Sequence, residues 1–414
     1  MVNGVNVTLA TGLRTQFPRY WLSAFLSDFG DGVRLAAFPL LASRLSHSPA
    51  AVAVAVAVQG LPWLLGTGAG IIVDRTDGRR LMVIVDLVRA AIITALALAI
   101  AVNAVSMAII YVAAFATGVG SALRDSAAMT YLPRIAESAD LDRANSRLVI
   151  GRIVGYELAG PAAGSWLFGV AAVMPFAGNA SALGLSALLL LTLPSVFQTA
   201  TRGRPDRDVL ITVRSLRRDL WDGFRWLRTS SDIRDVIIAS GVICFLDAAW
   251  FAVLILYVIQ ILHQQPGVYG LLLALGALGG LLTGAVGARI FRRLGAWRSL
   301  LLSGIAMAGA QAVLGLSADL VIAAAMIFAG SAAFALFNIA TVTMIQRSVP
   351  VSMLGRVTGI YLTATRGAEA VGAIGGGVLA TTAGIRAPML AGAVPTAAVM
   401  ILLSWRHRAR ADSR

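Results

Sequence analysis

The sequence has no lysine and little charge of either sign. All 34 of its basic residues are arginine, and charged residues make up 13% of its 414 positions, against roughly 25% in an average soluble domain. Hydrophobic residues make up 58% of the chain. Because so few charges cannot cover a water-facing surface, the composition excludes a soluble protein and indicates one that crosses a membrane several times.

Cysteine and histidine are also scarce. Cys244 is the only cysteine, which excludes internal disulfides and cysteine-based metal sites. The three histidines, His47, His263 and His407, stand apart from one another, so they form no metal-binding cluster and we expect no cofactor. The net charge of +14 could suggest a nucleic-acid partner. The arginines are spread over alternate loops, however, so membrane topology explains them better and no nucleic acid is expected.

Apolar segments of about 20 residues, the length that crosses a bilayer as a helix, occur along the whole chain. The segment Ala51–Val58 alternates like a strand, but an unpaired strand would leave its backbone groups unsatisfied in lipid, so a helix is expected there. The sequence predicts an all-α integral membrane protein with twelve spans. They are expected at 18–44, 49–73, 81–103, 106–128, 146–170, 174–196, 234–262, 266–291, 299–316, 319–345, 355–382 and 386–405.

The arginines also predict the orientation of the chain. They gather in every second loop and at both ends, whereas the opposite loops hold little beyond Arg44 and Arg386. Because arginine marks the cytoplasmic side, both termini are expected in the cytoplasm. An arginine-only basic set with abundant Ala, Gly and Val is typical of a GC-rich bacterial genome, so the bacterial cytoplasmic membrane is the expected location.

The chain repeats itself at an interval of 217 residues. This interval relates Pro49 to Pro266, Gly70 to Gly287, Arg75 to Arg292, Gly78 to Gly295, Pro133 to Pro350, Gly155 to Gly372 and Gly160 to Gly377. Two prolines and an arginine at one constant offset favour two six-helix halves, residues 1–196 and 234–414 with a basic tail, related as a parallel repeat.

The connecting segment 197–233 is the longest charged stretch. Its apolar residues fall at steps of three and four, and its arginines occupy the rest of the helix surface. This pattern predicts an amphipathic linker helix lying on the cytoplasmic membrane surface. A helix that binds a partner protein is the alternative.

A charged connection between the second and third spans resembles a known signature. Gly70-x-x-x-Asp74-Arg75-x-x-Gly78-Arg79-Arg80 is similar to the loop between helices 2 and 3 of the major facilitator superfamily, with one extra residue between Arg75 and Gly78. Other stretches resemble the drug-exporter branch that includes macrolide-efflux and enterobactin-exporter-like proteins. They are Asp28-Phe-Gly-Asp31-Gly32, Leu61-Pro62-Trp63, Asp86-Leu-Val-Arg89, Gly160-Pro161-x-x-Gly164 in helix 5, Asp222-Gly-Phe-Arg225 and Gly355-Arg356-Val357.

The resemblance implies a fold of two pseudo-symmetric six-helix bundles and a cytoplasmic gate. The gate would bring together residues at the cytoplasmic ends of the helices. They are Gly70, Asp74, Arg75, Gly78, Arg79, Arg124 and Asp125, next to the start of helix 11 near Arg356. In the second-half copy of the loop Phe291 replaces the acid, so Asp74 is expected to act as the switch.

Charges inside predicted spans need a reason, because each costs about 2.5–3.5 kcal/mol at the bilayer centre. One interpretation is neutralisation by a nearby arginine: Arg34 for Asp31, Arg366 for Glu369, and Arg152 for Glu157. The other is proton coupling, in which a buried carboxyl binds and releases a proton. The coupling candidates are Asp28, Asp31, Glu157, Asp247 and Glu369.

The function that the resemblance implies is export of amphipathic small molecules, drugs or natural products, by alternating access, and the buried carboxyls favour proton antiport. The candidates for the substrate cavity are Tyr156, Trp250, Phe337, Asn338 and Tyr361. A siderophore, a sugar or a lysolipid is the alternative cargo, and a non-transporting receptor or scaffold is the alternative class. No enzymatic site is found, the proton gradient is the expected driving force, and a monomer in the lipid bilayer is the expected state.

Overall fold

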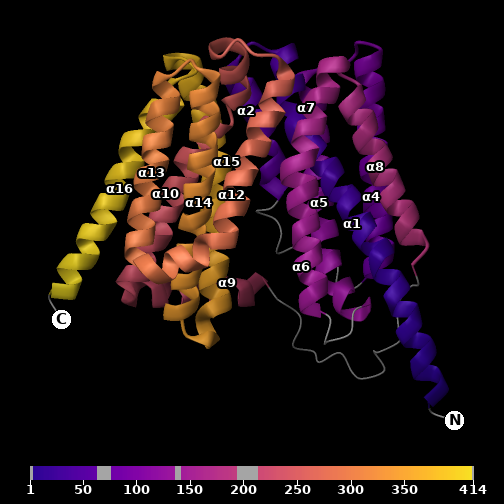
Figure 1. Ribbon diagram of the computed structural model, residues 1–414, viewed down its shortest axis with the longest axis horizontal. Coiled ribbons are helices and arrows are strands. Elements are labelled where there is room, and N and C mark those ends of the chain that lie inside the picture. Colours follow the sequence, from indigo (N-terminus) through magenta and orange to yellow (C-terminus); the bar gives the residue numbers. More distant parts are fainter. Residues whose placement is uncertain (1–2, 63–75, 136–140, 194–212, 413–414) are drawn as a thin grey trace. The chain divides into compact units, whose positions relative to one another are not determined.

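Helices account for all the regular structure in the residues that the computed structural model describes, which are 3–62, 76–135, 141–193 and 213–412 (Figure 1). The alternating segment Ala51–Val58 lies in helix α2 (Pro49–Gly60), so the expectation of a helix is confirmed. Backbone hydrogen bonds along the helix satisfy its amides without a neighbouring strand, which is what a membrane interior requires.

In the N-terminal half, the helices follow the expected spans. They are α1 (Asn3–Leu45), α2, α4 (Gly78–Ala101), α5 (Met107–Ile135), the consecutive segments α6 (Leu141–Arg152), η2 (Ile153–Ala159) and α7 (Gly160–Val170), and α8 (Met174–Leu191). The second expected span is described only as far as residue 62. The middle of the fifth span, η2, is a π-helix, a wider turn that is frequent at functional sites within helices.

In the C-terminal half, the linker helix α9 (Val213–Thr229) precedes six further spans. They are α10 (Ser231–Phe251) with α11 (Leu254–Leu256) and η4 (Tyr257–Ile261), α12 (Pro266–Leu294), α13 (Ala296–Leu316), α14 (Leu320–Ser348), α15 (Val351–Ala383) and α16 (Ala387–Asp412). The predicted fold class is confirmed.

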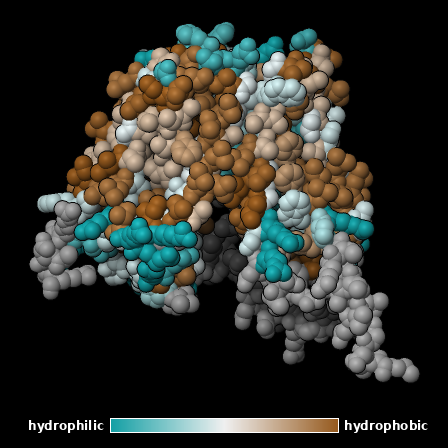
Figure 2. All heavy atoms as spheres, in the orientation of Figure 1, coloured by the Kyte–Doolittle hydropathy of each residue, from teal (hydrophilic) through white to brown (hydrophobic). Residues whose placement is uncertain are grey.

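The surface has the pattern of a membrane protein. In the described part of the chain, eight helices are long and apolar enough to cross a membrane. Many large apolar side chains are exposed on them, such as Val112, Leu188 and Val394. In Figure 2, apolar side chains cover the middle of the visible face and polar ones gather toward the ends of the helices.

Contacts between residues group the chain into two units. Unit 1 is Met1–Phe197 with Val258–Ala274, and unit 2 is Gln198–Tyr257 with Leu275–Arg414. The segment Val258–Ala274, which runs from η4 into the start of α12, therefore groups with the N-terminal residues, although it follows the linker in sequence. The predicted division at 196 and 234 stays a prediction.

The 217-residue repeat is visible in how helices cross. In unit 1, Gly32 of α1 lies against the backbone of η2, and a Cβ there would come within 2.5 Å of the Tyr156 carbonyl oxygen. In unit 2, Gly376 of α15 lies in the same close way against Ala249 of α10. Because Gly32 and Ala249 are 217 residues apart, the two crossings occupy equivalent places in the two halves. Small residues at both crossings let the helix backbones approach closely.

Candidate functional site

Five charged side chains are buried together in the N-terminal half. The set is Asp31 and Arg34 of α1, Asp86 and Arg89 of α4, and Arg124 of α5, none more than 9% exposed. We call them the buried charge network. Since all five lie within membrane-crossing helices, they persist there only through mutual ion pairs and hydrogen bonds.

Asp31 is the first centre of this network. Its Oδ1 accepts from Arg34 Nη2 at 3.2 Å and from Arg89 Nη2, and its Oδ2 accepts from Ser121 Oγ at 3.1 Å. The expected pairing of Asp31 with Arg34 is therefore present. The second arginine comes from another helix, so α1, α4 and α5 converge on one carboxylate.

Asp86 is the second centre. It lies 3.4 Å from Arg89 Nη1 and 3.0 Å from Arg124 Nε, and it accepts from Ser186 Oγ at 2.7 Å. Arg124 also donates to the Ser23 carbonyl at 3.3 Å. Arg89 thus bridges the two aspartates, and hydroxyl groups from α1, α5 and α8 occupy the remaining hydrogen-bond positions.

Asp86 and Arg89 were not predicted from the sequence to belong to a buried site. They were used there only as residues that resemble a known family. A signal was present, because Asp86-Leu-Val-Arg89 repeats the pattern of Asp31-Gly-Val-Arg34. In both, the acid and the base are three residues apart and share a helix face. Gly120 of α5 makes room for the second pair, since a Cβ there would lie 2.5 Å from Arg89 Cδ.

Asp28 lies one turn from Asp31 on α1, at the edge of the network. Its carboxylate has no hydrogen bond or ion pair to any described residue, yet it interacts electrostatically with Arg124, Asp125 and Arg152. The buried charge network has three arginines and two aspartates, which leaves one positive charge in excess. Asp28 in its ionised form balances that charge.

Arg152 does not pair as the sequence suggests. Its guanidinium lies 3.2 Å from Asp125 of α5, whereas Glu157 is exposed and makes no ion pair among the described residues. The spacing within one helix did not reveal that Asp125 of the neighbouring helix α5 lies within reach of the Arg152 guanidinium. Arg152 also lies 5.8 Å from the ring centre of Tyr156, one of the cavity candidates.

The helix-5 motif has a packing role. A Cβ on Gly160 would lie 2.6 Å from the Gly32 Cα, and one on Gly164 would lie 2.5 Å from the Val33 carbonyl. Pro161 occupies the start of α7 and is buried. The motif therefore brings α7 against α1 directly beside Asp31.

The candidates of the C-terminal half form smaller groups. Asp247 accepts a hydrogen bond from Trp250 Nε1 at 3.0 Å, and Arg366 pairs with Glu369 at 2.9 Å, as expected. Nearer the start of α15, the Tyr361 hydroxyl lies 3.4 Å from Asn338 Oδ1.

Phe337 was expected to line a cavity. It is 1% exposed and packs instead in an apolar core with neighbours such as Ile243, Leu300 and Met400. Helical spacing does not tell which face of α14 turns inward, so its burial follows from the packing of the neighbouring helices.

The gate candidates are only partly described. Gly70, Asp74 and Arg75 lie outside the described residues. Arg79 donates to the Leu190 and Leu191 carbonyls at the end of α8.

The other gate candidates have separate partners. Gly78 begins α4, where Asp77 caps the helix by accepting from the Arg79 amide. Arg124 pairs with Asp86 and Asp125 with Arg152. The described candidates therefore do not form one cluster.

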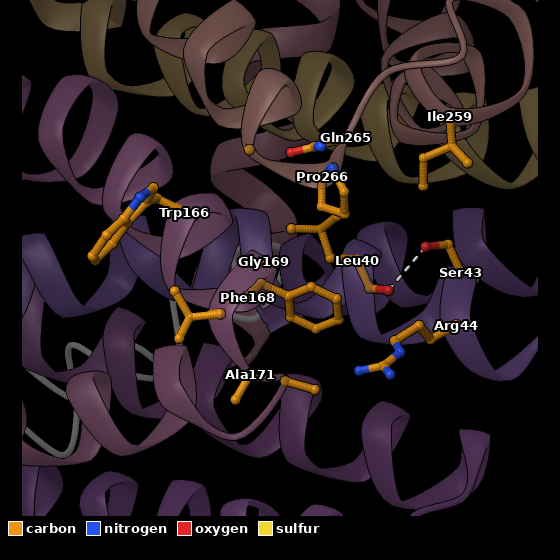
Figure 3. Close-up of a pocket in the computed structure, with 13 residues that line it drawn as sticks. Leu40, Ser43, Arg44, Trp166, Phe168, Gly169, Ala171, Ile259, Gln265 and Pro266 are labelled. Carbon is orange, nitrogen blue, oxygen red and sulfur yellow. Dashed lines mark hydrogen bonds between the residues drawn. The ribbon is translucent and has the colours of Figure 1, made fainter.

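A pocket of about 820 Å³ lies within unit 1, at the end of α1 that carries Arg44 (Figure 3). Its walls are largely apolar, with Leu40 and Phe168 among them, and Ser43, Arg44 and Gln265 are its polar side chains. The Arg44 guanidinium lies 5.9 Å from the centre of the Phe168 ring. The volume falls in the range of about 300–1,000 Å³ that is usual for small-molecule sites.

A family described as transmembrane secretion effector matches residues 8–413, nearly the whole chain. The chain belongs to this family of the major facilitator superfamily. This transporter is 30% identical over 410 residues to the multidrug efflux pump Tap of Mycolicibacterium fortuitum, covering 94% of this chain and 95% of that one.

The chain is also similar to one further bacterial protein in sequence and to a solved structure in fold. The transporter is 27% identical to the uncharacterized MFS-type transporter YfiS of Bacillus subtilis (strain 168), covering 88% and 86% of the two chains. A crystal structure of a mutant of the nucleoside transporter NupG has a TM-score of 0.77 at 14% identity, covering 95% of this chain and 99% of that one. At that identity the likeness shows the fold alone.

Proposed function

We propose that this transporter exports amphipathic organic molecules from a bacterial cell, in exchange for protons that enter through the carboxyl of Asp28. The similarity to a protein named a multidrug efflux pump supports the type of cargo. The largely apolar pocket of Figure 3, with a few polar side chains, suits an organic molecule that has both apolar and polar parts. The cytoplasmic membrane, cytoplasmic termini and a monomeric state belong to the same proposal.

The observation that carries the coupling mechanism is the position of Asp28. Asp31 and Asp86 each receive two arginines, so their charges are fixed in the network. Asp28 interacts electrostatically with Arg124 of this network and with Arg152, without an ion pair to a described residue. When Asp28 binds a proton, the excess positive charge of the network is left unbalanced, and when Asp28 releases the proton its carboxylate balances that charge again.

This change of charge provides a reason for exchange. A net charge in the membrane interior is costly, so proton binding at Asp28 shifts the balance of ion pairs around Arg124 and Arg152. Asp125, which holds Arg152 at 3.2 Å, is the carboxylate that competes with Asp28 for that arginine. Proton binding at Asp28 and cargo binding in the pocket of Figure 3 then alternate, which is the requirement of antiport.

Purified protein in liposomes, with ethidium as cargo and a pH-sensitive dye inside, tests the proposal. An imposed proton gradient should drive ethidium uphill, and ethidium moving downhill should move protons in the opposite direction. Asp28→Asn should lose both responses but keep ethidium exchange without a gradient. Asp31→Asn, Glu157→Gln, Asp247→Asn and Glu369→Gln test the other candidates. If Asp28→Asn and all four of these retain proton movement, carboxyl coupling is wrong.

Two outcomes would point to another function. If transport by the wild-type protein follows a sodium gradient and does not respond to a proton gradient, the coupling ion is sodium and not the proton. Cells lacking their own efflux pumps and expressing this protein should resist several amphipathic compounds. If the cells remain as sensitive to these compounds as cells without the protein, and the protein transports a siderophore, a sugar or a lysolipid, that molecule is the cargo instead.

A further inference from the structure

An apolar groove of about 420 Å³ lies in unit 2 where the linker helix α9 meets α10 and α15. We call it the linker groove. It is lined by Phe224, Leu227 and Arg228 of α9, Arg234, Ile237, Ile238, Gly241 and Val242 of α10, and Ile360 and Ala364 of α15. The function proposed above makes no use of it.

The groove follows from how α9 is attached. Leu227 is 5% exposed and packs in a core with residues of α10, α14 and α15, and Asp222 pairs with Arg356 of α15 at 3.5 Å. Gly223 lies against Ile360, where a Cβ would come within 2.8 Å of the Ile360 Cδ1. The helix is therefore fixed along one side, and the exposed Phe224 forms the edge of the hollow beside it.

The floor of the groove is one face of α10. Its lining residues from Arg234 to Val242 fall at steps of three and four, so they share a face over about 12 Å of helix. Gly241 supplies no side chain, and the nearest atom to a Cβ built there is 4.0 Å away. Ile238 is 58% exposed on a membrane-crossing helix, so this face meets lipid.

One end of the groove is basic. Arg228 and Arg234 line it there, close to the corner between α9 and α10. Arg228 has no acidic partner among the described residues, and its guanidinium lies 5.6 Å from the ring centre of Phe224. Among the described residues, Arg234 pairs with the carboxylate of Asp235, which it shares with Arg406 and Arg410. Positive charge is thus in excess at this end.

We propose that the linker groove binds an anionic phospholipid. The phosphate oxygens accept hydrogen bonds from Arg228 and Arg234, and an acyl chain lies along Ile237, Gly241 and Val242. The positive charges of Arg228 and Arg234 favour an anionic lipid over other ligands of the groove. Both arginines would repel a cationic amphiphile, and an apolar peptide would provide no anion to pair with them. The position at the start of a membrane-crossing helix suits a headgroup at the membrane surface with its chain in the hydrocarbon.

Native mass spectrometry of the purified full chain in detergent tests this, with dioleoyl phosphatidylglycerol as probe and the matching phosphatidylcholine as comparison. The wild-type protein should bind the anionic lipid more tightly. Arg228→Gln with Arg234→Gln should weaken that binding about tenfold and leave phosphatidylcholine unchanged. Gly241→Leu should weaken binding of both lipids, because its side chain fills the groove without changing any charge.

Arg225→Gln is the matched control, since Arg225 is exposed on the same helix but does not line the groove. It should keep wild-type binding. Equal losses for Arg225→Gln and the double variant would overturn the proposal, because general attraction to basic residues would then explain the affinity. So would a Gly241→Leu variant that binds as the wild type, equal affinity for the two lipids, or displacement of the lipid by excess inorganic phosphate. A thermal-unfolding measurement on each variant separates these results from loss of the fold.

Discussion

Arg89 of α4 donates a hydrogen bond to Asp31 of α1, which lies 58 residues earlier in the chain. Both side chains are buried inside membrane-crossing helices, where lipid provides no hydrophobic force to press helices together. The pair therefore fixes the contact between α1 and α4 by charge. It also connects the two aspartates of the buried charge network, because the same guanidinium lies 3.4 Å from Asp86.

Breaking this pair should destabilise the protein strongly. Asp31→Asn leaves Arg34 and Arg89 buried without their shared carboxylate, and removing one partner of a buried pair costs about 3–5 kcal/mol. Unfolding of the purified protein in detergent, followed by tryptophan fluorescence, measures the change in free energy. The double variant Asp31→Asn with Arg89→Gln should be less destabilised than the sum of the two single variants.

Arg366→Gln is the matched control for charge. It removes another arginine that pairs with an acid three residues away, but this pair is largely exposed, with 56% of the Arg366 side chain accessible. An exposed pair contributes below about 1 kcal/mol. A loss of stability as large as that of Asp31→Asn would contradict the role given to burial.

The space that the Arg89 side chain occupies beside Gly120 gives a second prediction. Gly120→Ala places a methyl group where the stem of Arg89 now lies, and overpacking of this kind costs about 1–3 kcal/mol. Gly184→Ala on α8, where nothing lies within 4 Å of a new Cβ, should be neutral or stabilising by up to about 1 kcal/mol. The same unfolding measurement compares them. Equal effects would mean that Arg89 does not depend on the space at Gly120.

The helices were predictable because a membrane imposes one rule along the chain. An apolar segment of sufficient length must be a helix there, so even the alternating segment Ala51–Val58 was assigned correctly. Pairs within one helix were predictable for a related reason. The three-residue spacing of Asp31 and Arg34, and of Arg366 and Glu369, places each pair on one face.

The network between helices was not predictable from those rules. Arg124 was assigned to the gate by its position near a helix end, whereas it pairs with Asp86 of α4. Which face of α5 turns toward α4 depends on the packing of several helices at once, and a single sequence does not contain that information. The repeated Asp-x-Val-Arg pattern marks the participants of α1 and α4 but not how they pair.

The loop between the second and third spans gives a third prediction, which rests on sequence. Asp74→Asn should impair transport and leave insertion and folding largely intact, because only this copy of the loop carries an acid. In the other copy Phe291 is buried, and the Arg347 guanidinium lies 5.5 Å from its ring centre. Ethidium efflux from cells, at matched protein levels, measures the effect. A fully active Asp74→Asn variant would make the loop a topological anchor only.

Asp77→Asn is the control three residues away. Asp77 caps α4 by accepting a hydrogen bond from the Arg79 amide at 3.0 Å, and asparagine caps a helix about as well as aspartate. This variant should keep transport, although it removes the same charge from the same loop. Equal losses in the two variants would assign the effect to net charge near the loop.

A cluster of charges joins the C-terminal helix to the start of α10. Arg410 donates to Asp232 and to Asp235, both at 2.7 Å, and Arg406 lies 3.6 Å from Asp235. The two acids differ in burial: 5% of the Asp235 side chain is accessible and 33% of the Asp232 side chain. Asp235 therefore holds the tail more firmly than Asp232 does.

This difference sets the last prediction. Asp235→Ala removes the acceptor shared by Arg234, Arg406 and Arg410 and should release the last turns of α16, whereas Asp232→Ala removes one partly exposed partner of Arg410 and should have a small effect. Trypsin cleaves after arginine, so the rate of cutting at residues 406–410 in the folded protein measures the release. The rate should rise markedly for Asp235→Ala and little for Asp232→Ala. If both variants are cut at the wild-type rate, packing of α16 against α10 and α13 holds the tail, and the ion pairs contribute little to it.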